Sequence, residues 1–157
     1  MTSILMPLER GQKEKSMKYD DVDWHVGGDF PKELDVRAAR THIGIFLAWA
    51  VAQGLESEML RSQYPDRLHD LRAGVLKGTD VLEQCCDDKL TNDDLSDLGN
   101  SFARDYYETS YLDDYVNLSD DALPTIYHEL ETPEKYQQVS RMLDKRYREW
   151  KDKRGVD

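Results

Sequence analysis

The residues best suited to chemistry lie in one short stretch, Trp24–Pro31, which reads WHVGGDFP. Its two glycines could let backbone amides approach a bound molecule closely, while His25 and Asp29 supply polar contacts. Trp24 and His42 would complete such a pocket. The alternative is that the glycines only form a tight turn, which the aromatic residues anchor to the core and Asp29 caps.

Familiar metal and nucleotide motifs are absent from the sequence. Asp21-x-Asp23-x-His25 begins like a calcium loop, but Val26 and Lys32 stand where that loop requires glycine and glutamate. No CxxC, HExxH, GxGxxG or GxxxxGKS/T motif occurs, and the four histidines are far apart along the chain. The sequence therefore predicts no bound metal and no cofactor.

A second candidate site combines tyrosines with acidic residues, namely Tyr107, Tyr111, Asp113, Asp114 and Tyr115. Tyrosine offers a large contact area with a polar tip and is enriched in protein interfaces. The carboxylates could pair with lysine or arginine on a partner. The alternative is a helix whose tyrosines are half-buried and whose acids are simply hydrated.

The negative charge of the chain is concentrated in one region. The formal net charge is −11, and residues 80–121 contain thirteen acidic and two basic residues, which accounts for the whole excess. This balance argues against nucleic acid and anionic membranes as direct ligands. It suits a basic protein partner, or solubility alone.

The two cysteines, Cys85 and Cys86, are adjacent. Neighbouring side chains on a helix point in different directions, so we expect no disulfide between them. No histidine lies near them in sequence, and we expect small buried hydrophobic side chains, not nucleophiles. Free thiols and the lack of a secretory signal predict a cytoplasmic protein.

The element that must position these residues is a helix over Thr41–Gln53. Every residue of the run Ile43–Ala52 is apolar or glycine. A helix that is apolar all round is a buried one, and this run is too short for a bilayer, which needs about 20 apolar residues. The rest of the chain is expected to cover this central helix.

Shorter signals complete a mainly α single domain, residues 17–154. Partial alternation over Tyr19–Val26 indicates a short strand or extended arm. Capping residues at Thr91–Asp94 predict the start of a tyrosine-bearing helix, and Thr132–Glu134 opens a last helix with proline at its first position. Met1–Ser16 is polar beyond Leu8, which predicts a flexible leader.

Three strings together resemble an uncharacterised family of small bacterial proteins: YDDVDWHVGGDFP, ARTHIGIFLAWAVAQGL and LTNDDLSDLGNSFARDYYETSYLDDY. The shared pattern is a W-H-x-G-G-D-F-P turn, a T-H-I-G-x-F-L-A-W helix and a G-N-x-F-A-x-x-Y-Y segment. The resemblance spans about Met17–Trp150 and implies no particular activity. Small acidic bacterial proteins of this kind are often similar in character to immunity proteins, which is an analogy only.

Two functional hypotheses follow. The first is a non-enzymatic acidic binding protein, such as an immunity protein that neutralises a basic bacterial toxin through the tyrosine-rich surface. The second is a small enzyme or small-molecule-binding protein that uses a pocket formed by His25, Asp29 and His42.

Overall fold

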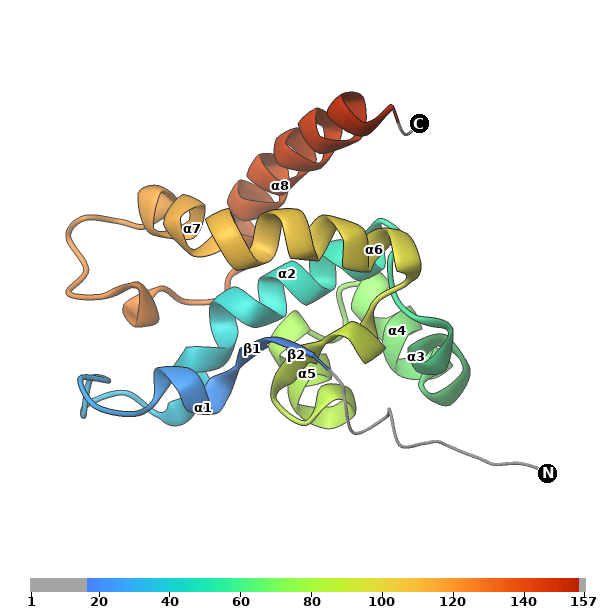
Figure 1. Cartoon of the computed structure of the whole chain (residues 1–157). Coiled ribbons are helices and arrows are strands. Elements are labelled where there is room, and N and C mark those ends of the chain that lie inside the picture. The colour runs from blue at the N-terminus through green and yellow to red at the C-terminus, as the bar shows by residue number, and fades with distance from the viewer. Residues whose placement is uncertain (1–16, 156–157) are drawn as a thin grey trace.

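The helix α2, Thr41–Ala52, is the centre of the computed structural model, which describes residues 17–155. Every residue from Thr41 to Val51 is buried, so α2 keeps no face for water. Such a helix needs neighbours on every side, and Figure 1 shows the other helices packed around it. The predicted central helix is confirmed.

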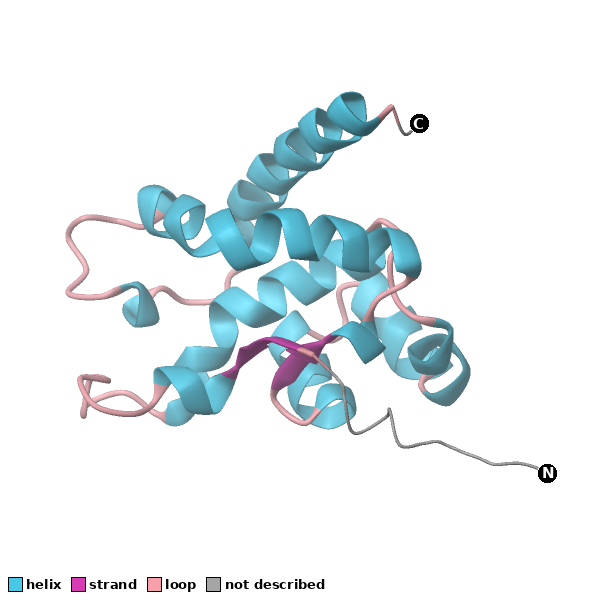
Figure 2. Cartoon of the chain, viewed as in Figure 1, coloured by secondary structure: helices cyan, strands magenta, loops and turns pink. Residues whose placement is uncertain are grey.

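Residues 17–155 are mainly helical, with one small sheet (Figure 2). This confirms the predicted fold class, including the short N-terminal β element. The elements, with η marking 3₁₀ helices except for the π-helix η4, are β1 (Lys18–Asp21), α1 (Val22–His25), η2 (Val36–Arg40), α2, α3 (Glu58–Gln63), α4 (Pro65–Arg72), α5 (Gly78–Cys86), β2 (Lys89–Thr91), η3 (Asn92–Asp94), α6 (Asp97–Phe102), η4 (Ala103–Tyr111), α7 (Leu112–Leu118), η5 (Ile126–His128) and α8 (Pro133–Arg154).

The strand β1 pairs with β2 in antiparallel fashion, with Asp20 opposite Leu90. The chain then turns directly into α1, which Asp21 caps by accepting a 3.0 Å hydrogen bond from the Asp23 N–H. The sheet therefore fixes α1 and Asp20 in place beside α2.

The helices α2 and α5 touch through their backbones. A Cβ atom on Gly78 would lie 1.9 Å from the carbonyl oxygen of Gly44, and one on Gly44 would lie 2.6 Å from the backbone nitrogen of Thr79. Only glycine permits so close an approach. These two glycines thus set the distance between α2 and α5.

The segments α6, η4 and α7 form one continuous helix that crosses α2 (Figure 1). It begins after Ser96, whose hydroxyl accepts a hydrogen bond from the Gly99 N–H at 3.1 Å. The predicted start at Thr91–Asp94 was too early, because Thr91 caps the short η3 turn instead. The middle of the helix is a π-helix, with i→i+5 hydrogen bonding, a rare form that is often found at functional sites.

The last helix, α8, begins at Pro133 as predicted, and the Thr132 side chain accepts a hydrogen bond from the Lys135 N–H at 3.0 Å. Asp144 of α8 accepts a 2.9 Å hydrogen bond from the indole of Trp49 in α2. The C-terminal half of α8 packs on the α6–η4–α7 helix, because the Trp150 indole donates a 2.8 Å hydrogen bond to Asp105 and its ring centroid lies 5.3 Å from that of Phe102.

No helix within residues 17–155 is long and apolar enough to cross a membrane. The predicted leader, Met1–Ser16, lies outside the described residues.

Candidate functional site

A buried carboxylate, that of Asp20, lies where β1, α1, α2 and η4 meet. Its Oδ1 is 2.6 Å from Nε2 of His25, and its Oδ2 accepts a 2.5 Å hydrogen bond from the Tyr107 hydroxyl. The backbone N–H of Asp21 also donates to Oδ1, at 2.9 Å. Asp20 is only 7% exposed, so these donors replace the water that surrounds the carboxylate in the unfolded chain.

His42 approaches the same carboxylate from the first turn of α2. The residue is 2% exposed, and its Nε2 lies 3.3 Å from Oδ2 of Asp20. The contact lacks the angles of a hydrogen bond, and this nitrogen has no other partner within the described residues. The His42 ring packs edge to face on that of His25, with centroids 4.5 Å apart. An unpartnered nitrogen at such depth is unusual and calls for an explanation.

His25 connects Asp20 to Tyr127 of η5. Its Nδ1 is 2.7 Å from the Tyr127 hydroxyl oxygen. An ionised carboxylate can only accept, so Nε2 of His25 donates to Asp20, and in that tautomer Nδ1 accepts from the Tyr127 O–H. Tyr127 packs in turn on Phe30, with ring centroids 5.1 Å apart. We call Asp20, His25, His42, Tyr107 and Tyr127 the Asp20 cluster.

The electrostatics of the Asp20 cluster favour one set of protonation states. Burial alone would raise the pKa of Asp20, but its contacts with His25, His42 and Tyr107 hold that pKa well below its usual range. Burial lowers the pKa of His42 more than the nearby Asp20 raises it. Burial and then Asp20 raise the pKa of Tyr107. At neutral pH the site therefore combines an ionised carboxylate with a neutral His42 and a neutral Tyr107.

Three side chains of the Asp20 cluster could hold a metal ion. Asp20, His25 and His42 each offer one ligand atom, and the three atoms lie within 4.8 Å of one another. Two imidazoles and one carboxylate bind zinc or iron in proteins and leave coordination positions open. Tyr107 and Tyr127 hold Asp20 and His25 from outside, as hydrogen-bonding groups around metal ligands commonly do.

The fold brings together part of the pocket predicted from sequence. His25 and His42 are neighbours, as that pocket requires, whereas Trp24 is 60% exposed and Asp29 lies in an exposed turn. Asp20 supplies the carboxylate that we expected from Asp29. Asp20 lies five residues before His25, just ahead of the stretch Trp24–Pro31. Its burial depends on the pairing of β1 with β2, which no local spacing reveals. His25 and His42, which seemed too far apart in sequence to bind one metal ion, are adjacent in space.

The tyrosines predicted to bind a partner are core residues. Tyr107, Tyr111 and Tyr115 are at most 6% exposed. The Tyr111 hydroxyl donates a 2.6 Å hydrogen bond to the backbone carbonyl of His42, which ties η4 to the start of α2. A partner cannot reach these rings in the folded chain, so their role is to pack the core and support the Asp20 cluster.

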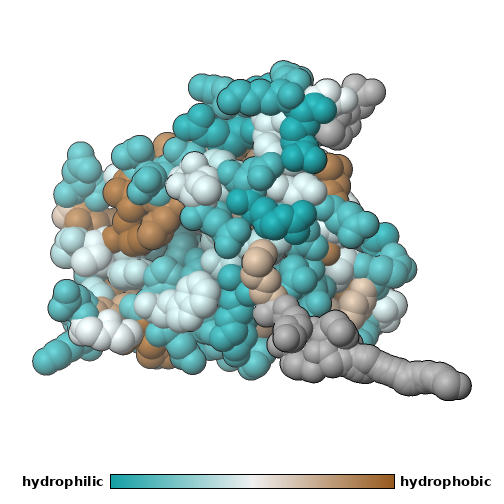
Figure 3. Space-filling view, viewed as in Figure 1, coloured by the Kyte–Doolittle hydropathy of each residue, from teal (hydrophilic) through white to brown (hydrophobic). Residues whose placement is uncertain are grey.

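The two acids of the same set have different surroundings. Asp114 accepts hydrogen bonds from the Arg146 guanidinium at 3.0 and 3.1 Å, whereas Asp113 is exposed. Leu112 and Val116, also on α7, are 43% and 46% exposed, and apolar residues gather around α7 on the face shown in Figure 3. The exposed face of α7 therefore presents one acid, Asp113, beside two apolar side chains.

The cysteines are free thiols, and Cys86 is buried while Cys85 is partly exposed. Burial raises the pKa of both thiols. A thiol with a raised pKa is a poor nucleophile at neutral pH, because the thiolate is the reactive form.

A comparison with protein families gives a match over most of the chain. The family model described as a domain of unknown function, DUF7832, matches residues 18–129. This segment contains the whole Asp20 cluster and ends before α8. No curated protein and no solved structure matches the chain. The chain belongs to the DUF7832 family, a domain of unknown function.

Proposed function

We propose that this protein binds a divalent transition-metal ion, with zinc as the first candidate, through Asp20, His25 and His42. The observation that carries the proposal is the unpartnered Nε2 of His42, buried 3.3 Å from the Asp20 carboxylate. A buried polar atom without a partner costs about 1–3 kcal/mol. A cation held between His42 and Asp20 would receive a lone pair from each and remove that cost.

The spacing of the ligand atoms supports this proposal. Zinc lies about 2.0–2.2 Å from imidazole nitrogen and carboxylate oxygen, which places tetrahedral ligands about 3.4 Å apart. The separation between Asp20 Oδ2 and His42 Nε2 is 3.3 Å. The 2.6 Å between Asp20 Oδ1 and His25 Nε2 is a hydrogen-bond distance, so His25 would give up its Nε2 proton when it ligates the ion.

A site with three protein ligands leaves room for water or a small molecule on the ion. A zinc ion bound in this way supplies Lewis-acid chemistry and lowers the pKa of its water. His25 and Tyr127 are the partly exposed members of the Asp20 cluster, so a small molecule would enter from their side. The proposal thus favours the small-molecule-binding or enzymatic hypothesis.

A purely structural hydrogen-bond network accounts for part of the same geometry. Asp20 joins β1 to α1 and η4 through His25 and Tyr107, and a satisfied buried network can make a core more rigid without any ion. Such a network leaves the His42 nitrogen with only a poorly aligned 3.3 Å contact to Asp20. Metal binding by histidine variants therefore separates the two explanations.

We expect His25→Gln to weaken zinc binding at least about tenfold, a typical effect of disturbing a metal site. His25 is partly exposed, and glutamine keeps a donor for Asp20, so the variant should fold. His69→Gln, on the exposed side of α4, is the matched control and should bind like the wild type. Isothermal titration with zinc in the presence of a competing chelator measures the affinity, and we expect one site per chain in the wild type.

Two outcomes would contradict the metal proposal. One is a wild-type protein that takes up no zinc, iron or other divalent transition metal. The other is a His25→Gln variant that binds zinc as tightly as the His69→Gln control does, since the ion would then lie elsewhere.

We propose as a second candidate that the exposed face of α7 binds a basic protein, as an immunity protein binds a toxin. The specific observation is that exposed Leu112, Asp113 and Val116 lie together on α7, within the region that carries the −11 excess. Charges of this kind mainly speed association, while desolvated apolar contacts slow dissociation.

With a basic partner in hand, we expect Asp113→Lys to slow association most strongly at low salt, and Val116→Ser to speed dissociation. Neither should unfold the chain, because exposed positions contribute little to stability. Asp66→Lys, an exposed acid in the first turn of α4, is the control for net charge. Surface-plasmon measurements that find all three variants equal to the wild type would exclude α7 as the interface.

A further inference from the structure

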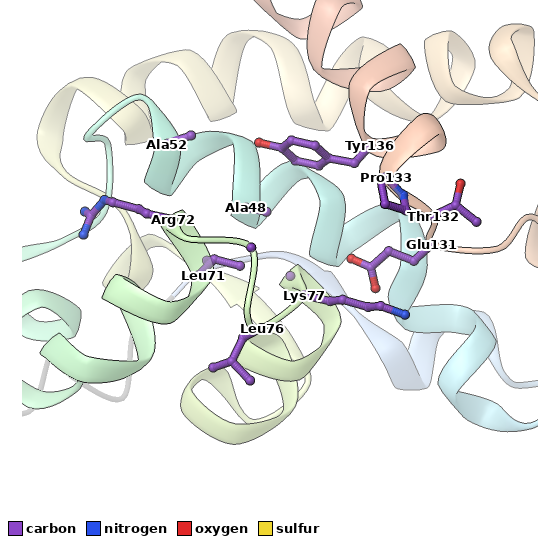
Figure 4. Close-up of a pocket in the computed structure, with 12 residues that line it drawn as sticks. Ala48, Ala52, Leu71, Arg72, Leu76, Lys77, Glu131, Thr132, Pro133 and Tyr136 are labelled. Carbon is purple, nitrogen blue, oxygen red and sulfur yellow. The ribbon is translucent and has the colours of Figure 1, made fainter.

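A cavity of about 290 Å³ lies on the other side of α2 from its contact with the α6–η4–α7 helix, between α2, the α4–α5 connection and the start of α8 (Figure 4). None of its lining residues belongs to the Asp20 cluster. Its volume is close to the lower limit of small-molecule sites, about 300 Å³. It therefore suits a ligand about the size of one substituted aromatic ring.

The walls of the cavity are apolar. Ala48 and Ala52 face it from α2, Leu71 from α4, and the Tyr136 ring of α8 lies across it (Figure 4). The two alanines leave the space that larger side chains fill elsewhere along α2. A flat apolar body would contact both the alanine face and the tyrosine ring.

One charged group is directed into this apolar space. The carboxylate of Glu131 points toward the interior of the cavity, whereas the amine of Lys77 points out of it (Figure 4). Oε1 of Glu131 accepts a 2.5 Å hydrogen bond from the Thr79 hydroxyl, and no salt bridge involves Glu131 among residues 17–155. Burial raises the pKa of Glu131 more than the hydrogen bonds from Thr79 and the charge of Lys77 lower it.

The other cation at the cavity, Arg72, is already engaged. Its guanidinium pairs with Glu56, a residue that is 1% exposed, and it points away from the cavity in Figure 4. A partly buried carboxylate that forms no ion pair is stabilised by a ligand that brings a cation. The inward-facing carboxylate of Glu131 thus favours a cationic group at its end of the cavity.

We propose that this cavity binds a small hydrophobic amine, whose ammonium group pairs with Glu131 and whose apolar body lies between Ala52, Leu71 and Tyr136. The Thr79 hydroxyl holds the carboxylate in position to receive the ammonium. Tyr136 adds the face of an aromatic ring, which attracts cations as well as apolar groups. This site is independent of the proposed metal site.

Benzylamine, benzyl alcohol and benzoate test the proposal, since they share one ring and differ in charge. We expect benzylamine to bind at least tenfold more tightly than benzyl alcohol, and benzoate to bind most weakly, in titrations followed by amide NMR shifts. Glu131→Gln retains an acceptor for Thr79 and should abolish the preference for the amine over the alcohol.

Ala52→Leu should fill the cavity and prevent all three probes from binding. Ala122→Leu is the matched control, because Ala122 is exposed in the loop after α7 and does not line the cavity. Far-UV dichroism of each variant confirms that it is folded. Equal affinity for the amine and the alcohol, unchanged selectivity in Glu131→Gln, or binding that survives Ala52→Leu would overturn the proposal.

Discussion

Gly78→Ala is expected to destabilise the folded chain by at least about 4 kcal/mol, which is exceptional for a single methyl group. The added Cβ would lie 1.9 Å from the carbonyl oxygen of Gly44. This atom belongs to the backbone of the central helix, so no side-chain rotation can relieve the clash. Net domain stabilities are about 5–15 kcal/mol, and the variant should therefore be largely unfolded at 37 °C.

Gly27→Ala is the matched control for Gly78→Ala. A Cβ on Gly27 would meet nothing within 4 Å, so its unfolding midpoint in urea should change little. Helix propensity predicts the opposite order, because alanine is better than glycine by about 0.5–1 kcal/mol within a helix. A Gly78→Ala protein as stable as the Gly27→Ala control would show that α2 and α5 are not in backbone contact.

Asp20→Ala is expected to cost about 3–5 kcal/mol, because each buried donor that loses its acceptor costs about 1–3 kcal/mol. The substitution leaves His25, Tyr107 and the Asp21 N–H without their common acceptor. Asp20→Asn should cost less, because its amide oxygen still accepts and its NH₂ group can donate to the neutral His42. Both variants should lose zinc binding, because alanine offers no ligand atom and the neutral amide of asparagine is a poor ligand for zinc.

Urea denaturation and zinc titration of the two Asp20 variants thus report different properties. Asp23→Ala, an exposed acid three residues further on, is the control and should stay within about 0.5 kcal/mol of the wild type. An Asp20→Ala protein with the stability of that control would mean that the carboxylate does not hold β1, α1 and η4 together.

The sequence predicted those parts of the fold whose patterns are local. The run Ile43–Ala52 has no polar face, and burial on all sides follows from that property alone. The start of α8 followed from Thr132 and Pro133, a cap and a first-turn residue that act within one helical turn. The N-terminal arm was visible as a partial alternation of apolar residues.

The parts that were missed depend on contacts between distant segments. The tyrosines of η4 and α7 carry polar hydroxyls and neighbour several acids, which in sequence is typical of a surface helix. In the structure the Tyr111 hydroxyl is satisfied by the backbone of His42, and the Tyr107 hydroxyl by Asp20. A polar group that finds its partner in the core can be buried, but that partner cannot be recognised from local spacing.

The candidate site shows the same division. His25 and His42 could be named from the sequence, because one lies in an unusual turn and the other begins an apolar helix. Asp20, the carboxylate that contacts both histidines, could not be named. It reaches them only because β1 pairs with β2, at Leu90, some 70 residues away. Metal ligands that come from different elements often have no linear motif.

Anomalous diffraction at the zinc absorption edge, from crystals of the wild-type protein grown with zinc, tests the proposed metal site most directly. We predict an anomalous peak between the Asp20 carboxylate, Nε2 of His25 and Nε2 of His42, and no such peak in crystals of Asp20→Asn. Zinc-loaded crystals in which these three residues keep their hydrogen-bonded positions, without a peak between them, would contradict the proposal.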